Sequence, residues 1–351
     1  METEKLSFAS DYMEGAHPRV MERLVQTNPV KTTGYGLDPF CEEARKKIRA
    51  ACACPGAAVQ FLVGGTQANA VTLGALLRPY EGVAAAGSGH ISVHEAGAVE
   101  LGGHKVLALP QVNGKLMPQE LRRYLEAFYA DENHEHMVFP GVVYLSQPTE
   151  FGTLYSLQEL RAIKELCRTY GLRLYVDGAR LACALGCPEN DVTLPELAML
   201  SDAFYIGGTK CGALFGEAVV IPDQKSLPHF FTVVKQHGAL LAKGRLLGVQ
   251  FDALFTDGLY EQIGRTTVEN AAILRRGLEQ RGVRLLYGSP TNQLFAVLEN
   301  GFMERLSRKV DFAFWKKYDE KRTVVRLATS WATTKRDVEE LLDVWDEAGR
   351  R

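Results

Sequence analysis

Long apolar runs are missing from this 351-residue chain, because none reaches the roughly 18 residues that a membrane-spanning helix requires. The amino-terminal stretch METEKLSFASDYMEG lacks the apolar segment of a secretory signal peptide. An excess of one charge is absent as well: the formal net charge at pH 7 is −2, which gives no basis for attracting nucleic acid or an acidic membrane. We therefore expect a cytoplasmic protein with neither kind of partner.

Common nucleotide- and metal-binding patterns are also absent. Neither of two glycine-rich turns, Gly64-Gly65-Thr66 and GGTKCG, matches the triphosphate-binding motif G-x-x-x-x-G-K-[ST], and the first also lacks the dinucleotide pattern G-x-G-x-x-G. The cysteine pairs Cys52/Cys54 and Cys183/Cys187 have no histidine or second pair at ligand spacing, so we expect no metal. The seven cysteines are an odd number, and we interpret them as free thiols.

Between residues 58 and 221, short apolar runs alternate with longer helix-like segments. The runs are AVQFLV, GVAAAG, HKVLAL, GVVYLS, LRLYV, DAFYI and EAVVI. Amphipathic segments such as MPQELRRYLEAFYA and SLQELRAIKELCRTYG lie between them, and the second ends in a glycine that favours helix termination. This alternation predicts an α/β fold with a mainly parallel sheet covered by helices. Such sheets bind ligands beyond the carboxyl ends of their strands.

The pattern changes after about residue 222. Long helical stretches come first, followed by the runs VRLLYG, NQLFAVLE and TVVRLAT and by a final helix, TKRDVEELLDVWDEAG. This order predicts a smaller C-terminal α+β domain. No Pro/Ser-rich linker marks the boundary, so we expect the two parts to share a helix over about 230–256. We divide the chain into an N-terminal arm with a large domain, 1–245, and a small domain, 246–351.

A single lysine stands where one predicted strand ends. In DAFYIGGTKCGALFG, Lys210 follows two glycines and a threonine, and its small neighbours leave room for a large group beside its ammonium. An ordinary exposed lysine in a turn is the alternative. Because the strand's carboxyl end lies at the expected ligand-binding edge, Lys210 is a candidate functional residue.

Two other predicted strand ends carry groups that could bind a ligand. In QFLVGGTQANA, a glycine turn leads into a helix that begins near Gln67, and the free N–H groups of a helix start can hold a phosphate. An ordinary N-cap by Thr66 explains the same residues. In LRLYVDGAR, Asp177 ends a strand that reads as buried, so its carboxylate requires a partner, either Arg180 or a ligand nitrogen.

These features together fit a pyridoxal phosphate site. Lys210 would form the Schiff base, Asp177 would keep the pyridine nitrogen protonated, and the helix start would hold the phosphate. The segment AGSGHISVHEAGAVE adds His90, His94 and Glu95 after another strand end. His90 follows two glycines and has the more open surroundings, whereas His94 is typical of a structural histidine.

With these residues identified, the chain resembles the low-specificity threonine aldolases, which belong to the fold-type-I pyridoxal phosphate enzymes. The motifs that carry the resemblance run nearly end to end, in the family's order: ASDYMEGAHP, GYGLDP, LVGGTQANA, GHISVHEAGA, VDGARL, GGTKCGA and RLATSWATT. The resemblance implies a fold like that of aspartate aminotransferase. It also implies a homotetramer or dimer whose active sites lie between subunits.

The resemblance also implies the roles of the cofactor-binding residues. Lys210 is the Schiff-base lysine, Asp177 the partner of the pyridine nitrogen, and His90 the residue stacked on the cofactor ring. The phosphate is held by Gly65, Thr66 and Gln67.

For the substrate, the resemblance implies that Ser10, Arg180 and Arg326 gather around the carboxylate. Tyr35 matches a position that a neighbouring subunit supplies, and Glu95 matches a glutamate near the substrate side chain.

Two positions depart from the family pattern. His94 stands where the family often has an aromatic residue, which affects the wall near the substrate side chain. In VVKQHGALLAKGR the family's phosphate-binding arginine is replaced, and Lys235, Lys243 and Arg245 are equal candidates to take its role.

The predicted function is retro-aldol cleavage of threonine or allo-threonine to glycine and an aldehyde. The candidate bases for the β-hydroxyl proton are Glu95, His90 and His94, and we rank Glu95, or a water it orients, first. Another reaction of the same cofactor, β-elimination or transamination, is the alternative. A non-catalytic regulator is disfavoured, because the chain shows no length or basic charge for a nucleic-acid-binding module.

Overall fold

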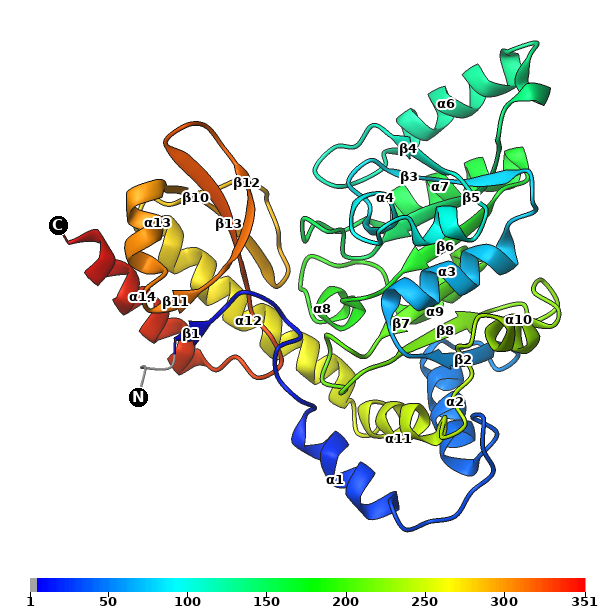
Figure 1. Ribbon diagram of the computed structural model, residues 1–351, viewed down its shortest axis with the longest axis horizontal. Helices are drawn as coiled ribbons and strands as arrows, with labels where there is room; N and C mark the ends of the chain where they lie inside the picture. The colour runs from blue at the N-terminus through cyan, green and yellow to red at the C-terminus, as the bar shows by residue number, and fades with distance from the viewer. Residues whose placement is uncertain (1–4, 351) are drawn as a thin grey trace.

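The computed structural model describes residues 5–350. Residues 1–4 and 351 lie outside the described part. The outer ends of the two predicted domains and the start of the METEKLSFASDYMEG segment therefore also lie outside it. Figure 1 shows a larger unit built on a wide sheet and a smaller unit, with the long helix α12 (Leu259–Gln280) running from one to the other.

The large unit contains a seven-stranded sheet with the order β2-β8-β7-β6-β5-β3-β4. All seven apolar runs of the sequence form its strands: β2 (Ala58–Leu62), β3 (Glu81–Ala86), β4 (Val106–Leu109), β5 (Phe139–Ser146), β6 (Arg173–Asp177), β7 (Ala203–Gly207) and β8 (Glu217–Ile221). Neighbouring strands from β4 to β7 are parallel, whereas β8 is antiparallel to both β7 and β2. The carboxyl ends of β2, β3, β5, β6 and β7 therefore lie at one edge, where β8 begins.

Helices cover both faces of this sheet. They are α1 (Pro18–Thr27), α2 (Pro39–Ala51), α3 (Gly65–Leu76), α4 (His90–Val93), α5 (Ala98–Leu101), α6 (Pro118–Ala130), the 3₁₀ turn η1 (His134–His136), α7 (Leu157–Tyr170), α8 (Leu181–Leu185), α9 (Leu194–Leu200), α10 (Phe230–Gln236) and α11 (Arg245–Leu254). Sequence signals set the limits of α7: Ser156 and Glu159 form a capping box at its start, and Gly171 (φ 70°) ends it.

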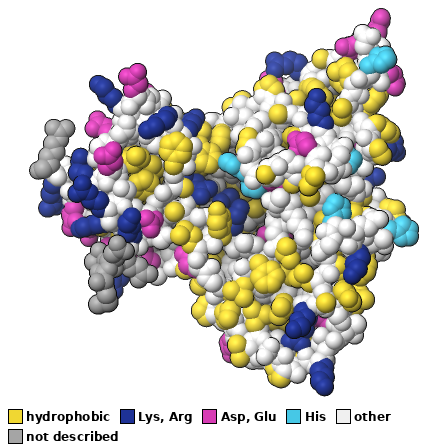
Figure 2. Space-filling model, viewed as in Figure 1, with side chains coloured by type: hydrophobic (Ala, Val, Ile, Leu, Met, Phe, Trp, Pro, Cys, Tyr) yellow, Lys and Arg dark blue, Asp and Glu magenta, His cyan; other side chains and the backbone are white. Residues whose placement is uncertain are grey.

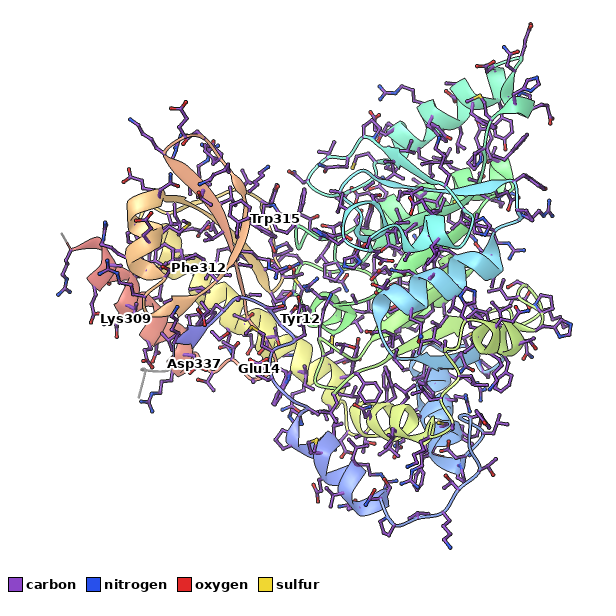
Figure 3. All side chains as sticks on the ribbon, in the orientation of Figure 1. Tyr12, Glu14, Lys309, Phe312, Trp315 and Asp337 are labelled. Carbon is purple, nitrogen blue, oxygen red and sulfur yellow. The ribbon has the colours of Figure 1, made fainter. Side chains whose placement is uncertain are left out.

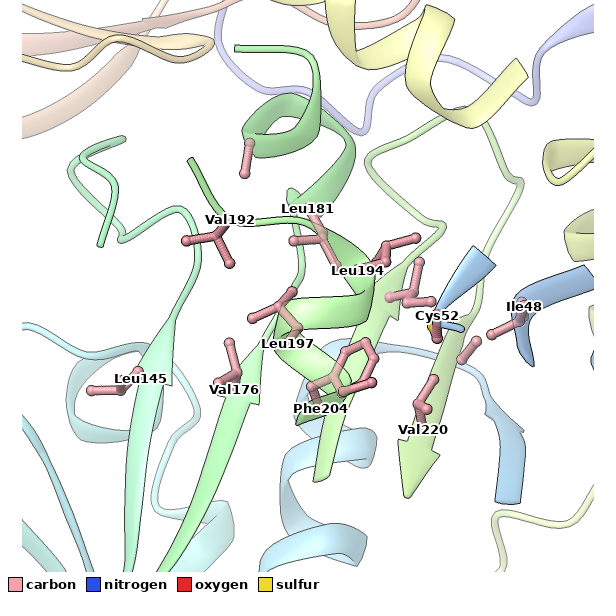
Figure 4. Packing of buried hydrophobic residues seen from close by; sticks show 14 of the residues in the cluster. Ile48, Cys52, Leu145, Val176, Leu181, Val192, Leu194, Leu197, Phe204 and Val220 are labelled. Atoms are coloured by element: carbon pink, nitrogen blue, oxygen red, sulfur yellow. The ribbon is translucent and has the colours of Figure 1, made fainter. Parts of the chain in front are cut away.

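Each face of the large sheet has its own hydrophobic core. On one face, Val143 and Leu145 belong to a cluster that includes side chains of α2, α6, α7, α9 and α11. On the other, Val142 and Tyr144 belong to a cluster that includes α3, α5 and α10. This alternation follows from the two-residue period of a strand. Figure 4 shows the first cluster, in which strand residues such as Phe204 pack beside α9.

The small unit confirms the predicted C-terminal α+β part. Its antiparallel sheet has the order β12-β13-β10-β9, with β9 (Arg284–Leu285), β10 (Gln293–Glu299), β12 (Ala313–Lys317) and β13 (Arg322–Ala328). Helices α12, α13 (Asn300–Leu306) and α14 (Lys335–Gly349) pack on it. The N-terminal strand β1 (Leu6–Ser7) pairs in parallel with β11 (Val310–Asp311), so the N-terminal arm starts on the small unit.

The predicted shared helix over 230–256 is wrong. Two short helices, α10 and α11, occupy this region, and the chain between them includes Gly238 at φ 63°, a conformation that ends a helix. The element that links the units is α12. Leu247, Phe251 and Tyr260 belong to the core of the large sheet, which favours moving the proposed boundary at 245 into α12.

Within residues 5–350, no helix combines the length and the apolar character needed to cross a membrane.

Candidate active site

A cavity of about 330 Å³ lies at the sheet edge where the strands' carboxyl ends meet. The loops that follow β2, β3, β5, β6 and β7 line it, together with the first residue of β8. Six of the residues that the sequence singled out share this cavity: Gly65, Thr66, His90, Asp177, Arg180 and Lys210. The topology therefore brings together residues separated by up to 145 positions in the chain.

Lys210 extends from a tight turn between β7 and β8. A Cβ on Gly208 would lie 2.6 Å from the carbonyl oxygen of Gly216, so this position requires glycine. Burial lowers the pKa of Lys210 below its ordinary value, and the positive charge of Arg180 lowers it further. A lysine with a lowered pKa is more often neutral, and the neutral amine is the form that attacks a carbonyl group.

Asp177 lies at the bottom of the cavity and is 3% exposed. Its Oδ2 accepts hydrogen bonds from the phenol of Tyr144 at 2.6 Å and from Nδ2 of Asn69 at 3.1 Å. Its Oδ1 accepts from the phenol of Tyr205 and from the backbone N–H of Ala179. These four donors stabilise a buried negative charge. The sequence offered Arg180 as a partner of Asp177, but Arg180 donates its hydrogen bonds to Asp11 instead.

His90 is held from behind by a buried carboxylate. Nδ1 of His90 lies 2.6 Å from Oε1 of Glu95, and the same oxygen accepts from Nδ2 of Asn69 at 2.6 Å. Burial alone would lower the pKa of His90, but the hydrogen bond to Glu95 and the charge of Asp177 raise it above its ordinary value. The Glu95 side chain has 0% exposure and lines no part of the cavity. The sequence suggested that Glu95 contacts the substrate, but in this geometry His90 lies between Glu95 and the cavity.

The glycine turn after β2 begins helix α3 at Gly65, with Gly64 as its N-cap and no side-chain cap. The predicted helix is therefore present but begins two residues before Gln67, and the alternative of an N-cap by Thr66 is wrong. Gly65 and Thr66 line the cavity with the first turn of the helix, where N–H groups are free. A Cβ on Gly65 would come within 3.0 Å of the Tyr205 phenol. Gln67 instead accepts from the N–H of Val63 at 3.1 Å.

A second cavity, of about 460 Å³, adjoins the first and reaches the small unit. Arg180 and Lys210 line both cavities, and Arg326, on β13, lines the second. Figure 2 shows Lys or Arg side chains with a histidine beside them in the hollow between the two units. This region would attract an anion such as a carboxylate.

The far wall of the second cavity is aromatic. His94 lies 6.1 Å from Trp315 of β12 between ring centroids, and Trp315 packs edge-on against Phe295 at 4.9 Å. Tyr12, from the N-terminal arm, lines both cavities. Figure 3 shows Tyr12 and Trp315 at the border between the large and small units.

The two arginines have different surroundings. Arg180 donates from Nε to Oδ2 of Asp11 and from Nη2 to Oδ1 at 3.0 Å, so one edge of its guanidinium is already occupied. Arg326 donates from Nη2 to the carbonyl oxygen of Ala9 at 3.0 Å, and its buried Nε has no partner within residues 5–350. Both retain N–H groups that a ligand could use.

A family model described as "Beta-eliminating lyase" matches residues 7–329 of the chain. The chain belongs to the beta-eliminating lyase family. The low specificity L-threonine aldolase of Pseudomonas sp. (strain NCIMB 10558) is 30% identical, covering 88% of this chain and 89% of that protein. The corresponding protein of Pseudomonas aeruginosa is also 30% identical, covering 85% and 86% of the two chains.

Solved structures extend this similarity. The threonine aldolase of Leishmania major superposes with a TM-score of 0.94 at 42% identity, covering 97% of this chain and 98% of that one. An aspartate aminotransferase of Thermus thermophilus superposes with a TM-score of 0.72 at 16% identity, which shows a common fold, and covers 98% and 92%. The predicted fold class and the resemblance to threonine aldolases are confirmed.

Beta-eliminating lyases use pyridoxal phosphate, as the sequence predicted for this chain. The residues present fit that group. The cavity offers an amine on Lys210, a fully hydrogen-bonded carboxylate on Asp177, and the start of α3, where glycine leaves space beside Tyr205. An imidazole, His90, completes the lining.

Other predicted residues are not brought into either cavity of this chain. Ser10 is buried next to Asp11 but lines neither cavity, and Tyr35 is 43% exposed. The three candidates for the replaced phosphate-binding arginine also lie outside both cavities: Lys235, whose Nζ lies 4.8 Å from the ring centroid of Tyr35; Lys243, which is exposed; and Arg245, which donates to the carbonyl oxygens of Thr27 and Val30.

Sequence reasoning missed the tyrosines that surround Asp177. Tyr144, Tyr175 and Tyr205 each stand two residues before the carboxyl end of a neighbouring strand, so their side chains form one layer beneath the cavity. Tyr175 donates to Oδ1 of Asn69 at 3.0 Å, which orients that amide between Glu95 and Asp177. The sequence does contain a signal for this layer, because each of the three apolar runs has a tyrosine at the same distance from its end.

Two buried glutamates at the cavity were also missed. Glu217 begins β8 and accepts hydrogen bonds from the N–H of Gly208 at 3.0 Å and from the hydroxyl of Thr209 at 2.8 Å. Burial raises the pKa of Glu217 to about 8. Glu150 follows β5 and lines both cavities. No sequence motif marked either of them.

Proposed function

We propose that this protein is a pyridoxal phosphate-dependent lyase that cleaves L-threonine, L-allo-threonine and related β-hydroxy-α-amino acids into glycine and an aldehyde. The observation that carries the proposal is the junction of two cavities at Lys210. One cavity has the groups that fit the cofactor, and the other has two arginines that fit an amino-acid carboxylate. The named activity of the relatives supports the same reaction.

In this proposal, Lys210 bonds covalently to the cofactor and Asp177 keeps its ring nitrogen protonated. His90 lies against the ring, and Gly65 and Thr66, with Gln67 orienting the turn, hold the phosphate at the start of α3. When bound, the cofactor supplies an electron-withdrawing ring that accepts the electron pair released at Cα. Glu95 contributes by orienting His90, since its carboxylate is sealed behind the imidazole.

Arg326 and Arg180 bind the substrate carboxylate, and they are joined by Ser10, whose hydroxyl has no hydrogen-bond partner within residues 5–350. Asp11 accepts two hydrogen bonds from the Arg180 guanidinium and so fixes its orientation. Because Arg180 is already ordered, binding the substrate carboxylate costs little of its side-chain entropy. Fixing the carboxylate would set the orientation of the substrate and so select which bond at Cα breaks. We propose that this bond is Cα–Cβ, with His94, Trp315 and Tyr12 around the substrate side chain.

Other functions of the same fold have less support. The aminotransferases that superpose on this chain are about one-sixth identical to it, which bears on the fold alone. β-Elimination remains the second candidate, because the matching family model carries that description. A non-catalytic regulator has no feature of this site in its favour.

We further propose a homo-oligomer, a tetramer or a dimer, in which Tyr35 reaches the active site of a neighbouring subunit. The exposure of Tyr35 outside its own cavities supports this role. Figure 2 shows hydrophobic side chains gathered over α11 and nearby loops, a surface suited to such contact. The seven free cysteines support a cytoplasmic location.

Incubating the purified protein and cofactor with L-threonine, L-allo-threonine or L-serine tests the reaction. We expect glycine and acetaldehyde from the first two without any keto-acid acceptor. L-Serine should react more slowly, because it lacks the β-methyl group that stabilises the departing carbonyl. Production of 2-oxobutanoate and ammonia would assign the protein to β-elimination. A keto acid formed only with an acceptor present would make it an aminotransferase. Lys210→Ala is the control for each assay.

A further inference from the structure

The proposed cleavage requires a base for the β-hydroxyl proton, and Glu150 has the geometry for that role. It follows β5, is 9% exposed, and lines both the cofactor cavity and the adjoining cavity. Its Oε1 accepts from the backbone N–H of His90 at 2.9 Å and from the hydroxyl of Ser146 at 2.6 Å. Its Oε2 is buried and has no hydrogen-bond partner within residues 5–350.

The other acidic residues at the site are differently placed. Both oxygens of Asp177 and of Glu217 accept hydrogen bonds from the protein, and these two residues line only the first cavity. Glu95 lies behind His90 and lines neither cavity. Among the carboxylates of the described residues, Glu150 is therefore the one that lines both cavities.

The two candidate imidazoles are less suited. Nδ1 of His90 is bonded to Glu95, and its ring lies in the cofactor cavity. His94 lines only the second cavity, and burial lowers its pKa.

Oε2 of Glu150 is a buried carboxylate oxygen without a partner within residues 5–350, which costs free energy. A substrate hydroxyl that donates a hydrogen bond to this oxygen would remove that cost.

We propose that Glu150 is the catalytic residue that accepts the proton of the substrate's β-hydroxyl group. This inference rests on the proposed function. As the O–H bond breaks, its proton passes to the Glu150 carboxylate and its electron pair forms the carbonyl of the aldehyde. The Cα–Cβ bond breaks and its electron pair remains on Cα, which then takes a proton from water to become glycine, while Glu150 releases the proton it accepted and returns to the carboxylate form. No external oxidant or reductant is required.

Two features suit Glu150 to this step. Burial raises the pKa of its carboxyl group above the ordinary value, which makes it a stronger base than an exposed glutamate. The bonds from His90 and Ser146 hold Oε1, so the second oxygen keeps a fixed position. Proton transfer by a positioned side chain contributes about 10²–10⁴-fold to a rate.

Glu150→Gln tests the assignment with little change in shape. The amide oxygen can still accept from His90 and Ser146, but the side chain no longer takes a proton at neutral pH. We expect kcat/KM for L-threonine to fall about 10²–10⁴-fold. Cofactor content, its visible spectrum and the melting temperature should stay unchanged. Exchange of the glycine α-hydrogen with deuterated water, measured by NMR, should also persist, because glycine has no β-hydroxyl.

Two further variants complete the test. Glu150→Asp keeps the proton acceptor on a shorter chain and should recover part of the lost activity. His94→Gln removes the competing base from the wall around the substrate side chain, so KM for L-threonine should change, but kcat should fall less than in Glu150→Gln. The assignment is overturned if Glu150→Gln cleaves threonine at the wild-type rate, or if cleavage, glycine exchange and cofactor binding decline together. It is also overturned if His94→Gln alone loses cleavage selectively. A wild-type protein that exchanges glycine but releases no aldehyde would refute the proposed function, and Glu150's role with it.

Discussion

Asp11 and Arg180, 169 residues apart in the sequence, form a buried ion pair at the border of the two units. Nη2 of Arg180 lies 3.0 Å from Oδ1 of Asp11, and Nε contacts the second oxygen. Asn292 donates to the same carboxylate at 2.9 Å. The N-terminal arm thereby connects the loop after β6 of the large unit with the segment before β10 of the small unit, and it fixes an arginine that lines both cavities.

Asp11→Asn should destabilise the protein in a pH-dependent way. Burial alone would raise the pKa of Asp11, but Arg180, Lys210 and hydrogen bonds lower it to about 2, whereas the unfolded value is about 3.9. Because the folded pKa is the lower one, the stabilisation is fully present above about pH 4 and is lost as the pH falls toward 2. The variant leaves Arg180 buried and unpaired, so we expect a loss of about 3–5 kcal/mol in the free energy of unfolding at pH 7.

Urea unfolding of both proteins at pH 7 and at lower pH measures this difference, which should narrow toward acid pH. Equal stabilities at pH 7 would contradict a structural role for the pair. Glu14→Gln, in the same arm, is a control that leaves the ion pair intact.

Lys210 should be the site of covalent cofactor attachment. Its lowered pKa favours the neutral amine that reacts with the cofactor's aldehyde. The purified protein should absorb visible light, and borohydride should abolish this absorbance while fixing the cofactor to Lys210. Peptide mass spectrometry after reduction locates the label. Lys235 lies outside both cavities and should carry no label. The control variant Lys235→Ala should therefore still be labelled at Lys210. A label on any other lysine would refute the assignment.

Asp177→Asn should bind some cofactor but lose most turnover. The amide has no charge to keep the ring nitrogen protonated, and loss of such preorganised stabilisation lowers rates on the order of 10²-fold or more. Tyr205→Phe should have a smaller effect, because Asp177 keeps its bonds from Tyr144 and Asn69. Cofactor content by absorbance, measured beside the rate of aldehyde release, separates binding from catalysis. Near-normal turnover by Asp177→Asn would contradict the proposed role.

The sequence predicted the fold and the cofactor side of the site because both depend on local signals. Short apolar runs specify the strands, and residues directly after them necessarily meet at one edge of a parallel sheet. Lys210, Asp177 and His90 are all of this kind, and all three line one cavity. The site's position thus follows from topology once the strands are recognised.

Most of the remaining errors concern contacts between distant segments. No local pattern indicates that Arg180 pairs with Asp11 or that Glu95 is sealed behind His90, since both depend on how loops pack in three dimensions. The helix expected over 230–256 failed because Gly238 takes a positive φ after α10, and the apolar period alone does not reveal this break. Glu150 lies in a loop without a motif, so its burial and its unpartnered oxygen became visible only in the structure.

Arg326 provides the sharpest test of how the substrate is held. Its guanidinium donates from Nη2 to the carbonyl oxygen of Ala9 and from Nη1 to Oε1 of Gln293 at 3.4 Å, and its Nε has no partner within the described residues. The N–H groups that remain could give a carboxylate two parallel N–H···O bonds. Lysine carries the same charge but cannot copy this geometry. Arg326→Lys should therefore weaken amino-acid binding by about 1–3 kcal/mol. This corresponds to roughly a 5- to 150-fold rise in the apparent Kd for glycine or the KM for threonine.

The cofactor content of Arg326→Lys should match that of the wild type, because Arg326 lines only the second cavity. Titrating glycine against the cofactor's visible spectrum gives the Kd without requiring turnover, and steady-state assays with L-threonine give the KM. A variant that loses cofactor yet binds glycine normally would make Arg326 a structural or phosphate-binding residue. Arg322→Lys, on the same strand but paired with Asp319 at the surface, is the matched control and should behave like the wild type in both measurements.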